Sequence, residues 1–218
     1  MKEDLMDNIS VIIRNRNEAE YIGFALQSCI DHLNNPEIII VNDQNNDDSL
    51  EIVKLFNNRL KIKIIECQNY SPGKSINLGV NNSESEYILI LSGHSQITKI
   101  DLPGIKKDLE EYSAVFGKQV PIFRGKKITP RYIWSHFLNE RVANMYSQIE
   151  ERYFFHNAFS FFKKETLVNY PFDESLPGKE DRYWAKDMIA LGKQYIYSPQ
   201  NIANHFYTKN GATWKGIG

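Results

Sequence analysis

The sequence predicts an α/β fold, with a single, mainly parallel sheet flanked by helices. Short apolar runs alternate along the chain with segments whose apolar residues recur at helical spacing, the pattern of repeated strand–helix–strand units. Most runs in the first half also end abruptly in polar or glycine residues, as buried strands often do. With 218 residues and no internal repeat, the chain is long enough to bury a substantial core as one domain.

The predicted elements of the first half follow one another at regular spacing. Four strands are expected at residues 9–13, 37–41, 61–65 and 87–91, of which the first two are expected to be buried. Between them the sequence predicts helices over residues 19–33 and 49–56, and a third helix that begins at Pro72-Gly73. The polar residues at 45–49 supply the turn and the cap of the second helix.

The pattern changes beyond about Val120. A helix is expected over the aromatic-rich residues 132–155, a strand over 158–162 and another helix over 179–191. Most aromatic side chains of 132–155 are expected in the core or in an oligomer contact, with a sugar-stacking groove as the alternative. Residues 117–131 contain five basic side chains and no acidic one. This basic run is either an acceptor-side patch that touches anionic lipid or a solvated loop.

Composition excludes several classes of function. The 26 basic and 27 acidic side chains give a net charge of −1, so a nucleic-acid partner is not expected. The two cysteines, Cys29 and Cys67, lie far apart and predict buried thiols rather than a disulfide scaffold. The sequence lacks an apolar stretch of about 20 residues and an N-terminal signal block. We therefore expect a cytoplasmic protein, with peripheral contact at the inner membrane face and homo-oligomerisation left open.

Polar clusters after the predicted strands are candidate ligand-binding residues, because loops at the carboxyl ends of parallel strands converge on one crevice. Cations or free N–H groups there can bind a diphosphate, and a carboxylate such as Asp43 can accept from a base N–H. The candidates are Arg14, Arg16, Glu18, Asp43, Gly73, Lys74, Ser92 and His94. The structural alternative for each is an ordinary turn or solvated loop residue.

These segments, in this order, resemble family-2 glycosyltransferases with the GT-A fold. The matching stretches are ISVII at 9–13, NEAEYI at 17–22, EIIIVND at 37–43, GKSINLG at 73–79, EYILIL at 86–91, PFDE at 171–174, EDRYWA at 180–185 and His205. The resemblance implies one domain over 1–218, with a nucleotide-binding half (about 1–117) and an acceptor and catalytic half (about 118–218). It implies inverting transfer of a sugar from a nucleotide-sugar donor to a saccharide or lipid-linked acceptor, in surface polysaccharide synthesis.

The resemblance also assigns roles to residues. Asp43 corresponds to the aspartate that contacts the nucleotide base, and Arg14 and Arg16 fall in the nucleotide loop. Asn77 belongs to the matching segment at 73–79, on the donor side. Asp181 corresponds to the general base, with Glu180 beside it. His205 lies where many members have a histidine near the metal or the diphosphate.

One segment departs from the family pattern. The fourth strand usually ends in an Asp-any-Asp motif that holds a divalent metal, whereas this sequence reads Ser92-Gly93-His94-Ser95. Either His94 and His205 hold Mn²⁺ or Mg²⁺, or the site meets the diphosphate charge with cations and N–H groups alone. A rhamnosyltransferase-like subgroup is similar here, and GKQVP at 117–121 resembles a run found in it. The alternative functions are a nucleotidyltransferase and a catalytically inactive sugar-nucleotide binding module.

Overall fold

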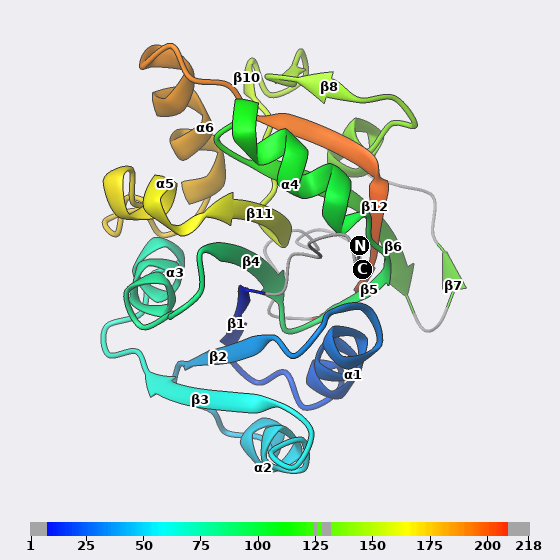
Figure 1. The fold of residues 1–218 in the computed structure, drawn as a ribbon, viewed down its shortest axis with the longest axis vertical. Helices are drawn as coiled ribbons and strands as arrows, with labels where there is room; N and C mark the ends of the chain where they lie inside the picture. The colour runs from blue at the N-terminus through cyan, green and yellow to red at the C-terminus, as the bar shows by residue number, and fades with distance from the viewer. Residues whose placement is uncertain (1–7, 124–125, 128–131, 209–218) are drawn as a thin grey trace, which may run out of the picture.

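The computed structural model describes residues 8–123, 126–127 and 132–208. Its centre is a sheet with the strand order β3-β2-β1-β4-β11-β6-β12-β5, to which β7 adds beside β6 and β8 beside β12 (Figure 1). Strands β3, β2, β1, β4, β6 and β12 run in one direction, while β11 and β5 run in the opposite one. The prediction of an α/β fold with a mainly parallel sheet is therefore confirmed.

The first half matches the prediction element by element. Its strands are β1 (Ile9–Asn15), β2 (Glu37–Asn42), β3 (Lys61–Glu66) and β4 (Tyr87–Ser92). Its helices are α1 (Ile22–His32), α2 (Ser49–Lys54) and α3 (Pro72–Asn81). Every residue of β2 and β4 is buried, which explains why their sequences are continuous apolar runs.

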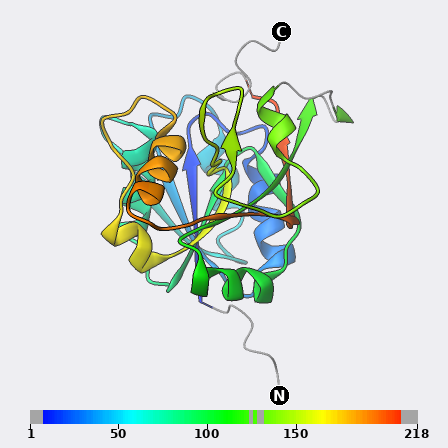
Figure 2. The same ribbon diagram turned by 90° about the horizontal axis from the view of Figure 1, so that it is seen from above.

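Helices cover both faces of the sheet, and Figure 2 shows α1 on one side with α5 and α6 on the other. Two apolar clusters result: α1, α2 and α4 pack on one face, and α3, α5 and α6 pack on the opposite face. Cys29 lies in the first cluster and Cys67 in the second, both as free buried thiols. None of the described helices is long and apolar enough to cross a bilayer.

Beyond β4 the structure contains elements that the sequence pattern did not predict. These are β5 (Ser95–Lys99), α4 (Leu102–Glu111), β6 (Val115–Phe123), β7 (Lys126–Lys127) and β12 (Ile196–Phe206). The predicted strand at 158–162 is β11 (Phe159–Lys163), followed by α5 (Lys164–Asn169). The predicted helix at 179–191 is α6 (Glu180–Ala190).

The expected helix over residues 132–155 is wrong. The segment holds a short 3₁₀ helix, η1 (Tyr132–His136), and the short strands β8 (Val142–Ala143), β9 (Tyr146–Ser147) and β10 (Arg152–Tyr153). Asn144 and Glu151 both adopt positive φ, which a continuous α-helix does not allow. Phe154 and Phe155 are fully buried, so the aromatic density reflects an irregular segment that fills the core.

Half of the basic run belongs to the sheet. Residues 117–123 form most of β6, and Lys118 Nζ donates to Asn139 Oδ1 at 2.5 Å. A solvated loop is therefore the wrong description of 117–123. Arg124 and Arg131 lie outside the described residues, so the anionic-lipid patch stays a prediction.

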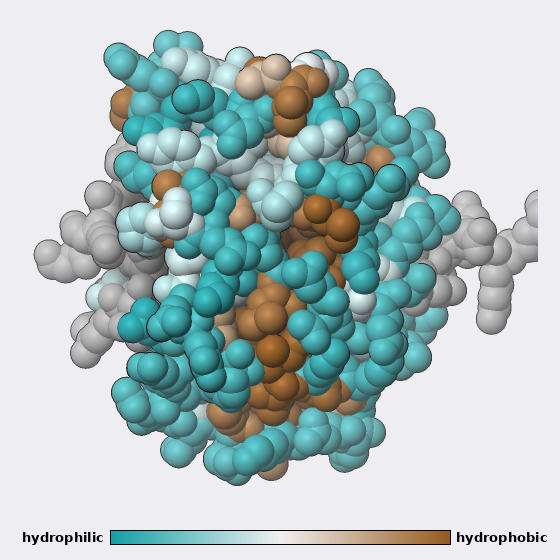
Figure 3. All heavy atoms as spheres, turned by 90° about the vertical axis from the view of Figure 1, so that its left-hand side faces the viewer, coloured by the Kyte–Doolittle hydropathy of each residue, from teal (hydrophilic) through white to brown (hydrophobic). Residues whose placement is uncertain are grey.

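The outer edge of the sheet is formed by β3, which exposes lysines alongside apolar side chains. Lys61 Nζ lies 2.7 Å from Glu84 Oε2, and Lys63 Nζ donates to Asn82 Oδ1 at 3.0 Å. Ile64 is exposed on the same strand, and a band of apolar side chains crosses the surface at the level of α3 and β3 (Figure 3). Charged side chains along an edge strand oppose pairing with another strand.

Candidate active site

The loops after β1, β2 and β4 meet at one edge of the sheet. Arg14 lies opposite Val41 on β2 and opposite Ser92 on β4, so the ends of the three strands are level with one another. Ser92 is buried, and its N–H donates to the Ala158 carbonyl at 3.0 Å. The strand-end rule thus correctly brings the first, second and fourth strand-end loops together.

Arg14 connects this edge to helix α6. Its Nη1 lies 3.3 Å from Glu180 Oε1, although the two residues are separated by 166 positions in sequence. Burial lowers the pKa of Arg14, but Tyr70 and the nearby carboxylates of Glu180, Asp181 and Glu18 raise it above its ordinary value. The guanidinium therefore stays charged and holds the start of α6 against the end of β1.

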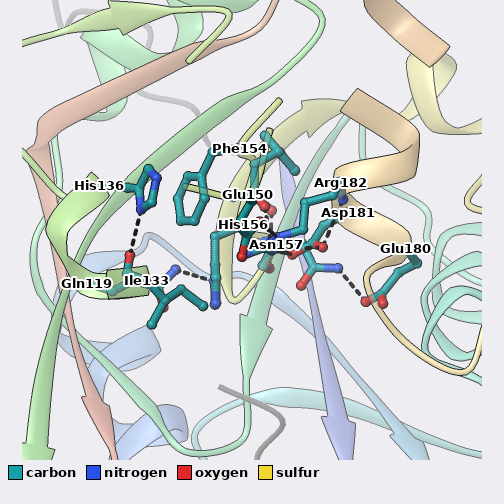
Figure 4. Close-up of polar contacts among 12 residues, drawn as sticks. Gln119, Ile133, His136, Glu150, Phe154, His156, Asn157, Glu180, Asp181 and Arg182 are labelled. Atoms are coloured by element: carbon teal, nitrogen blue, oxygen red, sulfur yellow. Dashed lines mark hydrogen bonds and ion pairs between the residues drawn. The ribbon is translucent and has the colours of Figure 1, made fainter. Parts of the chain in front are cut away.

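Glu180 is the first residue of α6 and is buried. Its Oε1 also accepts a hydrogen bond from Asn157 Nδ2 at 2.9 Å (Figure 4). Burial raises the pKa of Glu180, and the adjacent Asp181 carboxylate raises it further against the opposing effect of Arg14. A carboxyl group with a raised pKa can hold or release a proton closer to neutral pH than a free glutamate.

Asp181 follows in the same first turn and is held by the next residue. Arg182 Nη1 lies 3.0 Å from both Asp181 carboxylate oxygens, and Arg182 Nε donates to Glu150 Oε2 at 3.1 Å (Figure 4). Burial on its own raises the pKa of Asp181, but Arg182, His156 and hydrogen bonds to the carboxylate lower it overall. Asp181 is therefore ionised at neutral pH, as a general base must be.

His94 pairs with Glu18 rather than standing alone at the end of β4. His94 Nδ1 lies 2.9 Å from Glu18 Oε1, and both side chains are largely buried. Glu18 Oε2 is buried without a hydrogen-bond partner among the described residues. A Cβ on Gly93 would lie 2.9 Å from Glu18 Cγ and 3.1 Å from the Arg14 carbonyl oxygen, so only glycine lets the two loops approach this closely.

A row of buried polar side chains continues from His94 across the sheet. The rings of His94 and His205 meet edge to face with 4.8 Å between centroids. Gln119 on β6 lies between two histidines: its Oε1 is 2.6 Å from His205 Nδ1, and its Nε2 is 2.8 Å from His156 Nδ1. Burial lowers the pKa of His156 to about 3 and lowers that of His205 well below its ordinary value. Both rings are therefore neutral near pH 7.

The residues at this place do not form a recognisable metal site. Within the described ranges, no three His, Cys, Asp or Glu side chains are grouped so that they could hold a metal ion. His94 and His205 supply two imidazoles, but their Nδ1 atoms are already paired with Glu18 and Gln119. Mg²⁺ prefers several oxygen ligands, and the segment Ser92–Ser95 offers no carboxylate. The side chains at this place therefore do not fit a bound divalent cation in the way that an Asp-any-Asp motif would.

Asp43 lies at the end of β2 on the same edge of the sheet, in a corner formed with Arg16 and Tyr70. It is buried after β2, and its N–H donates to the Asn15 carbonyl at 3.0 Å. Arg16, whose side chain is 62 % exposed, places Nε 3.4 Å from Asp43 Oδ2 and its guanidinium 5.7 Å from the centre of the Tyr70 ring. The arrangement combines a carboxylate acceptor with an aromatic face and a cation.

The first turn of helix α3 lies near Asp43. Ser71 caps it by accepting from the Lys74 N–H at 3.2 Å. Burial raises the pKa of the Cys67 thiol, Lys74 opposes this effect and Asp43 adds to it, so both charged groups lie near Cys67. Asn77 has a different place: its Nδ2 donates to the Phe172 carbonyl at 2.8 Å, and its Oδ1 accepts from the Phe172 N–H.

Gly73 is required by packing against the segment after α5. A Cβ at this position would lie 2.4 Å from the Asp173 carbonyl oxygen and 3.0 Å from its carbonyl carbon. Asn77 Nδ2 also donates to Glu174 Oε1 at 3.0 Å. The structure therefore places Gly73 and Asn77 where they attach α3 to residues 172–174, and their predicted contact with a donor stays a prediction.

Several residues of the site were not predicted from the sequence. Asn157 and His156 precede β11, Arg182 and Glu150 hold Asp181, and Tyr70 faces Arg16. Gln119 appeared only as part of the run at 117–121. No local pattern marks these residues: Gln119 lies in the middle of β6, and the others lie in the first turn of α6 or in connections between elements.

Comparisons with known proteins show which family the chain belongs to. Residues 10–170 match the family model "Glycosyl transferase family 2". The chain is 26 % identical to the poly(ribitol-phosphate) beta-N-acetylglucosaminyltransferase TarS of Staphylococcus aureus, over 151 residues that make up 63 % of this chain. Over 110 residues, 50 % of the chain, it is 32 % identical to the glycosyltransferase GlyA of Streptococcus pneumoniae. The chain spans 26 % of the length of TarS and 16 % of that of GlyA.

Solved structures share the fold at low sequence identity. The crystal structure of S. aureus TarS 1–349 in complex with UDP-GlcNAc superposes with a TM-score of 0.72 at 20 % identity, over 97 % of this chain and 62 % of that one. GalNAc-T7 with UDP, GalNAc and Mn²⁺ superposes with a TM-score of 0.71 at 16 % identity, over 96 % of this chain and 45 % of that one. The fold is thus the GT-A fold, and because the family model matches most of the sequence, the chain belongs to glycosyl transferase family 2.

Proposed function

We propose that the chain transfers a sugar, with inversion, from a nucleotide-sugar donor to a saccharide or lipid-linked acceptor in the synthesis of a surface polysaccharide. The observation that carries the proposal is the Arg14–Glu180 pair, at 3.3 Å. It brings the carboxyl edge of the nucleotide-type strands against a turn with two adjacent buried carboxyl groups, Glu180 and Asp181. A donor pocket and a candidate base then share one site.

The donor would lie across the strand ends. Asp43 and Tyr70 suit the base, with Asp43 accepting from a base N–H and Tyr70 offering an aromatic face. Arg16 and Lys74 supply positive charge between that corner and the rest of the site. His94, held by Glu18, stands where the diphosphate is expected from the family resemblance.

The chemistry requires one base and stabilisation of a leaving group. In the proposed step, the Asp181 carboxylate takes the proton from an acceptor hydroxyl. At the same time the oxygen of that hydroxyl attacks the anomeric carbon of the donor sugar, from the face opposite the nucleotide. The bond from that carbon to the diphosphate oxygen breaks, and the nucleoside diphosphate leaves with the bonding electron pair. Arg14 pairs with Glu180 and raises the positive potential near both carboxylates, so it can stabilise the negative charge of the assembled site.

The relatives suggest which ligands to test first. TarS has been crystallised with UDP-GlcNAc and is named for transfer of N-acetylglucosamine to poly(ribitol-phosphate). We therefore propose UDP-sugars as the first donor class for this chain, and polyol phosphates among the acceptors to be tried. The rhamnosyltransferase-like features at 92–95 and 117–121 add dTDP-deoxyhexoses to the donors.

A thermal-shift screen of nucleoside diphosphates and sugar nucleotides, each with Mn²⁺ and with EDTA, tests donor class and metal need together. A ligand at about 100 times its dissociation constant should stabilise the protein by about 2.7 kcal/mol. Because the described side chains do not form a metal-binding group, we expect the best nucleotide to stabilise the protein equally with Mn²⁺ and with EDTA. Flat curves for every nucleotide would contradict the proposal.

Turnover separates the proposed function from its two alternatives. A glycosyltransferase should release nucleoside diphosphate as the sugar is transferred to an acceptor or to water. Release of pyrophosphate from a nucleoside triphosphate and a sugar phosphate would indicate a nucleotidyltransferase. Tight nucleotide binding with neither product would indicate an inactive binding module.

A further inference from the structure

A second surface feature lies next to the candidate base. Helix α6 and the β9–β10 hairpin enclose a shallow pocket of about 350 Å³. Its lining residues are Tyr146, Glu151, Arg152, Tyr153, Arg182, Tyr183 and Lys186. Three of the seven are tyrosines, and none of the predicted donor residues is among them.

The tyrosines present aromatic surface to solvent. Tyr146 is 46 % exposed and Tyr183 is 44 % exposed, while Tyr153 packs edge to face on Tyr146 with 5.5 Å between ring centroids. The neighbouring Phe154 and Phe155 are fully buried, whereas the rings of Tyr146 and Tyr183 lie outside the core. Rigid amphipathic rings that stay exposed commonly serve as contact surface, because little side-chain entropy is lost when a partner packs on them.

Arg182 joins the pocket to the candidate base. The residue forms part of the pocket wall, and its Nη1 binds both carboxylate oxygens of Asp181 at 3.0 Å. Its guanidinium carbon also lies 4.7 Å from the centre of the Phe154 ring, so the side chain is fixed on more than one side. A molecule in the pocket therefore lies one side chain away from Asp181.

Charge at the pocket favours a neutral ligand over a polyanion. Arg182 pairs with two carboxylates, those of Asp181 and Glu150, so this cluster carries one net negative charge. Among the remaining lining residues, Arg152 and Lys186 against Glu151 leave one net positive charge, so the pocket and its surroundings are neutral overall. Arginine, lysine and glutamate side chains around aromatic faces offer the donors and acceptors that sugar hydroxyls need.

We propose that this pocket is an acceptor subsite that holds an uncharged sugar ring next to the one carrying the attacking hydroxyl. The inference rests on the proposed function, since it names where the acceptor of that reaction binds. The ring packs its C–H face on Tyr146 or Tyr183, and its hydroxyls reach Arg152, Glu151 and Lys186. The pocket thereby makes transfer to a chain of sugars more efficient than transfer to a single sugar.

The test compares Tyr146→Ala and Tyr183→Ala with Leu191→Ala, which removes an exposed apolar side chain at the far end of α6. Maltotriose, chitotriose and a rhamnose trisaccharide serve as probes, with fluorotyrosine NMR reporting on the pocket. At least one probe should shift the resonances of Tyr146 and Tyr183. Each tyrosine variant should raise the KM of that probe as acceptor by about tenfold, with the Leu191 variant unchanged.

Hydrolysis of the donor by water separates this inference from the proposed function. The tyrosine variants should hydrolyse the donor at the unmodified rate and with the same donor KM, because neither residue belongs to the donor pocket. If the unmodified protein releases nucleoside diphosphate from no sugar nucleotide, with or without an acceptor, the proposed function fails, whereas the NMR shifts still report on the pocket. Resonances unmoved by all three trisaccharides, or acceptor KM values unchanged in both variants, would overturn the subsite.

Discussion

Arg182 binds both carboxylate oxygens of Asp181, the residue that precedes it, with 3.0 Å from Nη1 to each oxygen. This contact lowers the pKa of Asp181, while burial and the charge of Asp181 raise the pKa of Glu180. Adjacent residues in one helical turn therefore have pKa values shifted in opposite directions. Environments that separate the pKa values of neighbouring groups commonly mark an acid–base pair.

The first prediction concerns Asp181 as the base. Asp181→Asn keeps the size of the side chain but removes the proton acceptor, so we expect the transfer rate to fall by about 10²-fold or more. Donor affinity, measured by titration calorimetry, should change little, since the donor residues lie on the strand ends. Wild-type turnover in this variant would show that another group takes the proton.

The second prediction concerns the coupling between the two carboxyl groups. Asp181→Asn removes the negative neighbour that raises the pKa of Glu180, so the pKa of Glu180 should fall toward its ordinary value. The carboxyl ¹³C resonance of Glu180, followed across pH, measures this change. Glu165→Gln on α5 is the matched control and should leave the Glu180 titration in place. A higher Glu180 pKa in the Asp181 variant would contradict the assigned coupling.

The third prediction concerns the tautomers of two histidines. A primary amide has one acceptor oxygen and one donor nitrogen, and Gln119 places them against the Nδ1 atoms of His205 and His156. Two neutral rings on such a bridge must have opposite tautomers, with the proton on Nδ1 in one and on Nε2 in the other. Long-range ¹⁵N–¹H spectra of the ring nitrogens can identify both. In Gln119→Leu the two histidines should no longer be required to have opposite tautomers. If His156 and His205 have the same tautomer in the unmodified protein, Gln119 does not bridge them as assigned.

The fourth prediction concerns stability in mild acid. Burial lowers the pKa of His156 to about 3, so between pH 6.5 and 3 the unfolded chain binds a proton that the folded protein does not. The contribution of neutral His156 to the free energy of unfolding is complete above about pH 6.5. It is lost as the pH falls toward 3, at up to about 1.4 kcal/mol per pH unit for one group. His156→Gln should flatten the dependence of the free energy of unfolding on pH. His32→Gln, in the last turn of α1, should keep the wild-type slope.

The fifth prediction concerns the approach of α3 to the loop after α5. Gly73→Ala would place a methyl group 2.4 Å from the Asp173 carbonyl oxygen, so backbone must move and stability should fall by about 1–3 kcal/mol. At Gly178 no atom lies within 4 Å of an added Cβ, and Gly178→Ala should change stability by less than about 0.5 kcal/mol. Urea unfolding measures both. Equal effects in the two variants would contradict the close packing.

The first half of the fold was predictable because its signals are local. Fully buried parallel strands are continuous apolar runs, and their carboxyl ends identify the loops that carry Arg14, Glu18 and Asp43. Glu180 and Asp181 were found by resemblance, since nothing in their own segment shows that α6 begins beside β1. The residues of the strand-end site could therefore be named, whereas the polar contacts among them could not.

The second half was less predictable because long-range pairing determines it. Gln119 lies beside Ala203 through the pairing of β6 with β12, which is set by strand order and not by periodicity. Strand β12 also contains a register shift between Ser198 and Ile202, with proline and polar residues at the irregularity, so its sequence lacks the alternation of a regular strand. Segment 132–155 misled the prediction because turns with positive φ at Asn144 and Glu151 interrupt the chain between its buried aromatics.

The ion pair between Arg14 and Glu180 also has a consequence for how the enzyme is made. Its partners are separated by 166 residues, so a growing polypeptide exposes the strand-end loops long before the carboxyl groups of α6 have been synthesised. A partly translated chain can therefore carry the strand-end loops without the turn that contains Glu180 and Asp181. The two parts of the site can meet only after residue 181 has been synthesised and α6 has folded against β1.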